Sequence, residues 1–355
     1  MTHSQTLEEQ AVGPEISDLA QRLAAGGAVQ GQGWQMIEPR GEKNGIRIGD
    51  VAVVLLRDAY YFPRSGLILD AEGRALASPL EVVRGGAAAA EKARSQLGRA
   101  VPMGRASVFA GGGGRRNYGH FLLDDLAGAA WLETLGIARH YPLIAPPLTG
   151  WQRALMGAAG VRATEVSEPV LRVAELVYTT AIGHYLQRAD KMQRDLVDRL
   201  PRGAAPGAGA VYLSRRGMTG RVMVNEPALE ARLKAQGVTI LKPHKMTVAE
   251  QIEAVSSARV LIGASGAALA NAVFLPKGGT VIEIRPATVR EFWIFLMTDN
   301  LSLTHHLIDV GGALKGRDVP LRTRLMQLPR QLARRYRVAY RCDLEAVERA
   351  VSAAL

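Results

Sequence analysis

The feature that most constrains the fold is a repeated alternation of strand-like and helix-like segments in residues 211–286. Four short apolar runs have the length and β-branched composition of buried strands: 211–214, 238–241, 259–262 and 280–284. Helix signals lie between them, such as Thr247 followed three residues later by Glu250, which is the spacing of a capping box. Strands that alternate with helices of about 10–12 residues predict a parallel, doubly wound α/β sheet.

Arginines and small residues follow two of the predicted strands. Arg215 and Arg216 come directly after the first strand. The third strand ends in a turn of five small residues, Gly263, Ala264, Ser265, Gly266 and Ala267. Ligands of parallel sheets lie outside the carboxyl ends of the strands, where small residues let a phosphate approach the backbone, and guanidinium groups suit a diphosphate. We therefore predict a diphosphate site here, with a ligand-free tight connection as the alternative interpretation of the turn.

Two further polar residues near this edge are candidate ligand-binding residues. Asn271 follows the small-residue turn, and its amide serves either a ligand or the packing of its helix. Glu283 ends the last predicted strand. It is either a ligand for ribose or other sugar hydroxyls or an exposed charge at the end of the strand. His305 and His306 are adjacent, so on a strand they point to opposite faces and make a poor metal site.

The first half of the chain contains the motif N-Y-G-H-F-L-L-D at 117–124, which opens an apolar-periodic helix. His120 and Asp124 are four residues apart and are predicted to lie on one helix face. A carboxylate at that distance orients the imidazole and favours its protonated form. The alternative is that His120 packs at the helix start and Asp124 balances a neighbouring arginine.

Together these segments resemble glycosyltransferase family 61. The resemblance rests on the 117–124 motif and on Y-L-S-R-R at 212–216, A-R-V-L-I-G-A-S-G-A-A-L-A-N at 258–271 and V-I-E-I at 281–284. It covers residues 118–135 and 211–286, and implies a GT-B fold, in which two Rossmann-like lobes face each other across a cleft. It also implies transfer of a sugar from a nucleotide donor with inversion. Many members carry a histidine where this chain has Ser265, so Ser265 contacts the donor differently or not at all.

The resemblance implies roles for the residues of both halves. Sugar transfer to a hydroxyl needs a base, for which His120 and Asp124 are rival candidates. It also needs positive charge on the departing diphosphate, which the two arginines after the first strand supply. Asn117 and Tyr118 are assigned to the acceptor side.

The predicted function is that of an inverting glycosyltransferase acting on a glycan or lipid-linked acceptor in cell-surface polysaccharide assembly. The co-substrate is a nucleotide sugar, with a UDP-linked sugar as one candidate, and no bound cofactor is required. The sequence shows no D-x-D, H-x-x-E-H or clustered Cys/His spacing, which argues against a protein-held metal and leaves open a divalent ion carried by the nucleotide. The alternative function is a non-catalytic nucleotide-sugar-binding or scaffold subunit, which Ser265 and the missing metal motif suggest. A Rossmann oxidoreductase is disfavoured, since no G-x-G-x-x-G opens a helix of this unit.

The charge balance raises the question of nucleic-acid or membrane partners, since the net charge is +11. No basic run interleaved with aromatic side chains occurs, so nucleic acid is not predicted. Five arginines fall in one predicted terminal helix that suits either a membrane surface or packing on the first lobe: Arg330, Arg334, Arg335, Arg337 and Arg341. The single cysteine and the N-terminus, which lacks an apolar signal region, predict a cytoplasmic location with peripheral contact at the inner membrane.

At 355 residues the chain is longer than most single cores, which predicts two lobes. The sequence P-R-G-A-A-P-G-A-G at 201–209 has the composition of a linker. We expect five segments: a helical arm at 1–33, an acceptor-side lobe at 34–200, the linker at 201–209, a nucleotide-sugar-binding lobe at 210–300, and a C-terminal segment at 301–355 whose helices return to the first lobe. Short strands in 34–79 favour an antiparallel or mixed sheet there.

Overall fold

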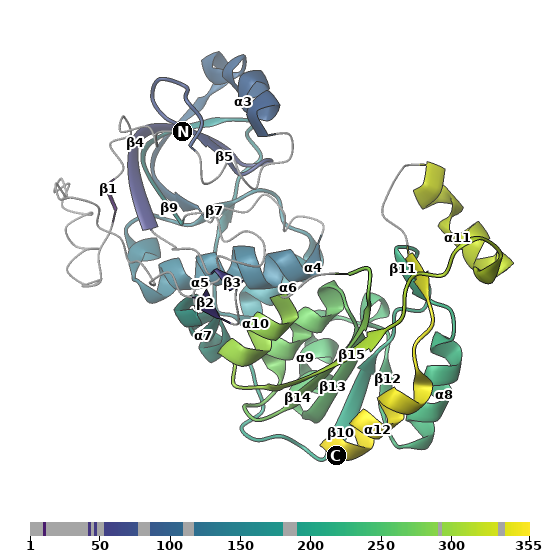
Figure 1. Cartoon of the computed structure of the whole chain (residues 1–355). Helices are drawn as coiled ribbons and strands as arrows, with labels where there is room; N and C mark the ends of the chain where they lie inside the picture. Colours follow the sequence, from purple (N-terminus) through teal and green to yellow (C-terminus); the bar gives the residue numbers. More distant parts are fainter. Residues whose placement is uncertain are drawn as a thin grey trace. The chain divides into compact units, whose positions relative to one another are not determined.

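The chain divides into two compact units, Met1–Leu200 and Pro201–Leu355 (Figure 1). The computed structural model describes residues 10–11, 42–43, 46–47, 53–76, 86–108, 117–179, 190–289, 293–332 and 338–355. The helix predicted within the arm at 1–33 lies outside the described residues, where only Gln10–Ala11 are assigned, as strand β1.

The second unit is built on a five-stranded parallel sheet with the order β12-β10-β13-β14-β15. Its strands are β10 (Gly209–Leu213), β12 (Thr239–Leu241), β13 (Ala258–Ala264), β14 (Thr280–Pro286) and β15 (Thr304–Val310). The connections contain α8 (Glu226–Ala235), α9 (Val248–Ser256), η6 (Ala267–Phe274) and α10 (Trp293–Asn300). The predicted parallel α/β sheet is therefore confirmed, although η6, predicted as an ordinary helix, is a 3₁₀ helix.

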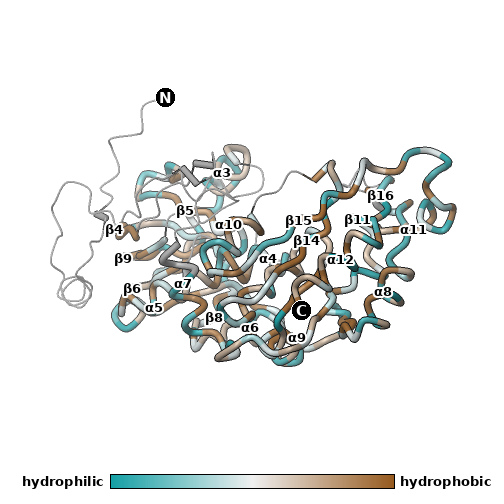
Figure 2. Tube along the Cα trace, turned by 60° about the horizontal axis from the view of Figure 1, so that its bottom comes forward, coloured by the Kyte–Doolittle hydropathy of each residue, from teal (hydrophilic) through white to brown (hydrophobic). Residues whose placement is uncertain are grey.

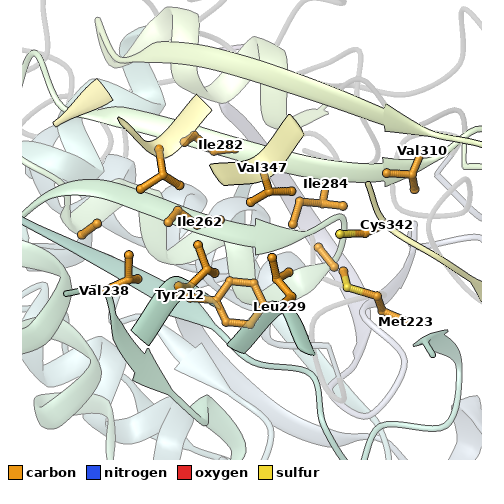
Figure 3. Close-up of a cluster of buried hydrophobic side chains, with 14 of the residues drawn as sticks. Tyr212, Met223, Leu229, Val238, Ile262, Ile282, Ile284, Val310, Cys342 and Val347 are labelled. Carbon is orange, nitrogen blue, oxygen red and sulfur yellow. The ribbon is translucent and has the colours of Figure 1, made fainter. Parts of the chain in front are cut away.

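One face of this sheet packs against α8 and the C-terminal helix α12 (Leu344–Ala354), as the hydrophobic cluster of Figure 3 shows. Val347, Val351 and Ala354 follow the i, i+4, i+7 pattern and are buried against the sheet. The prediction that the terminal helices return to the first lobe is therefore wrong for α12. Its apolar stripe completes the core of the second unit.

The sequence predicted one helix for the arginine-rich segment near the C-terminus, and this prediction is wrong. Helix α11 spans Leu321–Leu332, whereas Val338–Tyr340 form strand β16, which pairs in parallel with β11 (Arg221–Met223). All three β16 residues are buried, and the β-branched Val338 and the aromatic Tyr340 favour a strand.

The segment predicted as a linker packs tightly against the second unit. A Cβ atom added at Gly203 would lie 2.1 Å from the backbone oxygen of Ser256, and one at Gly207 would lie 2.0 Å from that of Ser257. Arg202 also donates from Nε to the backbone oxygen of Leu275 at 2.7 Å. The glycines of this segment therefore permit close approach to the end of α9.

The first unit contains a mixed sheet with the order β1-β4-β9-β6, to which β5 adds beside β4. Its main strands are β4 (Val53–Phe62), β5 (Leu67–Leu69), β6 (Val101–Val108) and β9 (Leu171–Thr179). β4 is antiparallel to β1, β5 and β9, whereas β6 is parallel to β9. The hydrophobic residues of β4 and β9 are brown in Figure 2. The Rossmann-like description therefore fits the second unit, while the described sheet of the first unit is mixed.

Shorter elements complete the first unit. They are β2 (Glu42–Lys43), β3 (Ile46–Arg47), α3 (Gly86–Arg94), β7 (Ile144–Ala145), α6 (Gly150–Ala158), β8 (Thr164–Glu165) and α7 (Asp190–Arg199). A continuous helical segment joins α4 (Tyr118–His120), the π-helix η3 (Phe121–Asp125) and α5 (Leu126–Thr134). Residues 121–132 are buried all round, as expected of a helix inside a core. Among the described residues, no helix is long and apolar enough to cross a membrane.

Candidate active site

The parallel sheet brings Arg215 to the small-residue turn that follows β13. β10 and β13 are neighbours, and Leu213 pairs with Gly263 at their carboxyl ends. A Cβ atom added at Gly266 would lie 2.5 Å from Nη1 of Arg215, so the guanidinium occupies the space that a side chain would need. Gly266 also has a φ of +154°, a conformation that other residues rarely adopt. The structure thus joins two predicted site residues that are 51 positions apart.

A second arginine converges on the same turn. Arg221, at the start of β11, donates from Nη1 to the backbone oxygen of Ser265 at 3.0 Å. Burial lowers the pKa of Arg215, and the charge of Arg221 lowers this pKa further. Nε of Arg215 is buried and has no hydrogen-bond partner among the described residues. An anion at the turn would supply that partner and offset the repulsion between the two cations.

Arg216 is placed differently from its neighbour. Its half-exposed guanidinium forms an ion pair with Glu230, at 2.9 Å between Nη1 and Oε2. The other carboxylate oxygen of Glu230 accepts a hydrogen bond of 2.6 Å from the hydroxyl of Ser214. At the turn itself, Arg221 accompanies Arg215, whereas Arg216 pairs with Glu230 and lies with Arg215 only along the lining of one pocket.

A pocket of about 440 Å³ opens beside Arg215 within the second unit. Its lining is strongly basic and includes Arg215, Arg216, Lys242, His244, Lys245 and Arg322. The carboxylate of Glu226 also lines it, and burial raises the pKa of this group, which favours its neutral form. Such a lining suits a polyanionic ligand.

Ser265 and Glu283 belong to a buried polar chain beneath the turn. The hydroxyl of Ser265 donates to Oε1 of Glu283, and Oε2 of Glu283 lies 3.1 Å from Nε2 of His305. Both Ser265 and Glu283 are buried, so the interpretation of Glu283 as an exposed strand-end charge is wrong. His306 is exposed on the other side of β15, as expected for adjacent strand residues.

The remaining predicted donor residue, Asn271, is also buried. Its Nδ2 donates to Oε1 of Gln251 at 3.1 Å, and Nε2 of Gln251 donates to the backbone oxygen of Pro243 at 3.1 Å. These two hydrogen bonds connect η6 to α9 and to the segment after β12. The capping box that begins α9 is confirmed, because Thr247 N donates to Glu250 and Glu250 N donates to Thr247.

In the first unit, the predicted pair forms directly. Nδ1 of His120 lies 2.8 Å from Oδ2 of Asp124, and the two side chains are 21% and 7% exposed. With Nδ1–H donated to the carboxylate, Nε2 is the ring nitrogen that accepts a proton. His120 directly precedes the π-helix η3 and Asp124 lies within it, and π-helical turns occur frequently at functional sites.

Asn117 and Tyr118 hold the start of this helix. Oδ1 of Asn117 accepts hydrogen bonds from the backbone nitrogens of Gly119 at 2.9 Å and His120 at 3.3 Å. The ring of Tyr118 lies 5.7 Å, between centroids, from that of Trp151 in α6, and burial raises its pKa. Asn117 therefore positions the backbone of His120, and Tyr118 packs the start of the helix against α6. Among the described residues, no group of three or more His, Cys, Asp or Glu side chains could hold a metal ion.

Comparison with known families now decides the class of the protein. Residues 118–282 match the sequence model of the Glycosyltransferase 61 family. The chain carries a glycosyltransferase family 61 domain. It is therefore a glycosyltransferase, as the resemblance of its motifs implied. A comparison with curated proteins found no relative that matches the chain.

The family 61 match includes His120, Asp124, Arg215, Arg221 and the turn, and it ends one residue before Glu283. Sequence reasoning missed Arg221, which lies in the family 61 domain and whose only signal is its position six residues after Arg215. It also missed Lys242, Lys245 and Arg322, which no spacing pattern connects. Lys242 and Lys245 follow the edge strand β12, and Arg322 belongs to α11 beyond the family 61 match, so only the tertiary fold places them around one pocket.

Proposed function

We propose that the protein is an inverting glycosyltransferase whose second unit binds the diphosphate of a nucleotide sugar at the turn after β13. The observation that carries this proposal is the convergence of Arg215 and Arg221 on the Ser265–Gly266 backbone. The sugar passes to a hydroxyl of a glycan or lipid-linked acceptor in cell-surface polysaccharide assembly.

The donor site stabilises the leaving group. As the glycosidic bond breaks, negative charge develops on the nucleoside diphosphate, and preorganised cations lower the free energy of that transition state. Arg215 and Arg221 supply this charge, and Lys242 and Lys245 add to the positive potential of the neighbouring pocket. The proposal requires no protein-held metal, and a divalent ion that enters with the nucleotide would act on the same charge.

His120 acts as the base that takes the proton from the acceptor hydroxyl. Asp124 orients the imidazole through Nδ1 and stabilises the imidazolium that forms. Asp124 is the poorer base, because it is more deeply buried than His120 and its Oδ2 already faces the ring. Deprotonated acceptor oxygen then attacks the anomeric carbon opposite the departing diphosphate, which inverts the configuration at that carbon.

The GT-B architecture and the cellular location are parts of the same proposal. Two compact units and the parallel sheet of the second unit support the architecture. A cytoplasmic location is supported by the single cysteine, Cys342, which is buried and unpaired.

Donor binding is tested by thermal-shift and calorimetric titration against a panel of nucleoside diphosphates and nucleotide sugars. We expect one nucleotide family to bind, and Arg215→Ala to weaken binding by about 1.5–3 kcal/mol through loss of a charge-assisted hydrogen bond. Arg232→Ala is the matched control, since Arg232 lies on α8 and pairs with Glu348 outside the pocket. Unchanged donor affinity in Arg215→Ala would exclude the diphosphate assignment.

A further inference from the structure

Helix α11 presents an apolar side to solvent. Seven large hydrophobic side chains are exposed among the described residues, and four of them lie on α11: Leu321 at 63%, Leu325 at 61%, Leu328 at 44% and Leu332 at 77%. Their positions i, i+4, i+7 and i+11 place them in one line along the helix. We call these four residues the leucine stripe.

The side of α11 that faces the protein is polar. Thr323 and Gln327, which lie on the side opposite the leucine stripe, are buried. Nε2 of Gln327 donates to the backbone oxygens of Thr219 at 3.2 Å and Val338 at 3.1 Å. A surface helix ordinarily turns its apolar side inward. Here hydrogen bonds hold the helix the other way round, at the margin of the second unit next to β11 (Figure 1).

The leucine stripe is flanked by positive charge. At 3.6 residues per turn, the exposed Arg322 and Arg324 fall on its two sides. The segment 319–342 contains seven arginines and no lysine, aspartate or glutamate, so it contributes +7 to a net charge of +11. Most of the exposed large hydrophobic side chains described in this unit thus lie within a strongly basic segment of the sequence.

We propose that α11 is a membrane-docking helix that lies on an anionic lipid surface. The leucine stripe enters the boundary of the acyl layer, and Arg324, which does not line the pocket beside Arg215, contacts lipid phosphates. The proposal goes beyond the transfer reaction, since the leucine stripe does not line the pocket beside Arg215, although Arg322 of α11 does.

A second copy of the chain is the competing partner for a leucine stripe. A symmetric contact would place α11 against α11, and would bring the flanking arginines of both copies together. Because α11 contains no acidic residue, these charges would have no partner within the helix pair. An anionic bilayer supplies the opposite charge, so the charge distribution favours lipid.

The test is co-sedimentation of the full chain with vesicles of phosphatidylglycerol mixed with phosphatidylcholine, and with vesicles of phosphatidylcholine alone. We expect binding to the anionic vesicles that weakens as salt is added. The double substitution Leu325→Gln and Leu332→Gln removes apolar area without disturbing a core, and should weaken binding by about tenfold or more. Arg324→Gln should weaken it by about fivefold, on anionic vesicles only.

Leu307→Gln is the matched control, because Leu307 is 40% exposed on β15 and lies off the stripe. Its vesicle binding should equal that of the wild type, and all variants should keep the wild-type circular dichroism spectrum. Absence of vesicle binding by the wild type would overturn the proposal, as would equal losses in Leu307→Gln and the double variant. A dimer in analytical ultracentrifugation that disappears in the double variant, without vesicle binding, would instead assign the stripe to a second copy.

Discussion

Gly266 and Arg215 depend on each other for their geometry. The guanidinium lies where a side chain at position 266 would project, and it packs against a glycine whose φ of +154° other residues rarely adopt. The backbone amide of Arg215 donates a hydrogen bond of 2.7 Å to Oε1 of Glu226, and this bond fixes the backbone from which the Arg215 side chain extends. The turn therefore needs glycine because of its tertiary neighbour as well as its own conformation.

Gly266→Ala should both destabilise the second unit and weaken nucleotide binding, because the new methyl group displaces the guanidinium and strains the backbone. We expect a loss of about 1–3 kcal/mol in the free energy of unfolding, measured by urea denaturation, with weaker donor binding in calorimetry. Gly278→Ala also replaces a positive-φ glycine but has no atom near the added Cβ. A Gly266→Ala variant that binds donor as tightly as Gly278→Ala would contradict the contact.

Cys342 is shielded from thiol chemistry. It is buried in the core of the second unit, and burial raises the pKa of its thiol to about 12. At pH 8 only about one thiol in 10⁴ would be ionised, so reaction with a thiol reagent should be slow in the native protein and fast after denaturation. The measurement is the fraction of Cys342 that the reagent labels at once in native buffer. Immediate stoichiometric labelling would show that the core around Cys342 is open.

Some site residues could be predicted from the sequence and others could not, for a physical reason. The His120–Asp124 contact follows from a local i, i+4 spacing on a helix. The meeting of Arg215 with the turn follows from the rule that parallel strands share one carboxyl edge. The ion pair of Arg216 with Glu230 has no local signal, and neither does the pairing of β11 with β16 that places Arg221.

At the scale of elements, the alternation of strands and helices was predictable because local and tertiary preferences agree there. The capping box of α9 marks its start, and the central strands β13 and β14 are buried on both faces. The terminal elements were mispredicted because elements far away in the sequence determine their secondary structure and their place in the fold. β16 is a strand because β11 offers a ladder, and α12 belongs to the second unit because its stripe matches an uncovered face of the sheet.

The packing of α12 is tested by Val351→Ala. Val351 is fully buried between α12 and the sheet, so its truncation should lower the free energy of unfolding of the second unit by about 2 kcal/mol. Arg349→Ala on the exposed side of α12 should change it by less than about 0.5 kcal/mol. Equal midpoints of urea unfolding for both variants would mean that α12 does not pack on this core.

At the scale of the whole molecule, each unit has its own hydrophobic core. One core joins the strands β10, β13 and β14 to α8 and α12, and a separate one surrounds β4, β6 and β9. The mixed sheet of the first unit joins Val53 to Thr179 and Val101 to Leu171. Such distant pairings leave no local pattern in the sequence, which is why its topology was predicted only as antiparallel or mixed.

Two cores predict two unfolding transitions in calorimetry, with the donor acting on one of them. A nucleotide that binds only the folded second unit, at about 100 times its dissociation constant, stabilises it by about 2.7 kcal/mol. We expect saturating nucleoside diphosphate to raise the midpoint temperature of the unfolding transition reported by Trp293 fluorescence. The midpoint temperature of the transition reported by Trp131 should not change. Single-tryptophan variants separate the two signals. A shift confined to the Trp131 transition would move the donor site to the first unit.

The central claim is that this protein transfers a sugar with His120 as the base and with Arg215 on the leaving diphosphate. It is tested most directly by measuring acceptor-dependent release of nucleoside diphosphate from the nucleotide sugar that binds, for the wild type and His120→Ala. We predict turnover by the wild type, and undiminished donor affinity with at least about 10²-fold slower release in His120→Ala. Equal rates for the two proteins would contradict the role of His120, and donor binding without turnover by the wild type would contradict the proposed reaction.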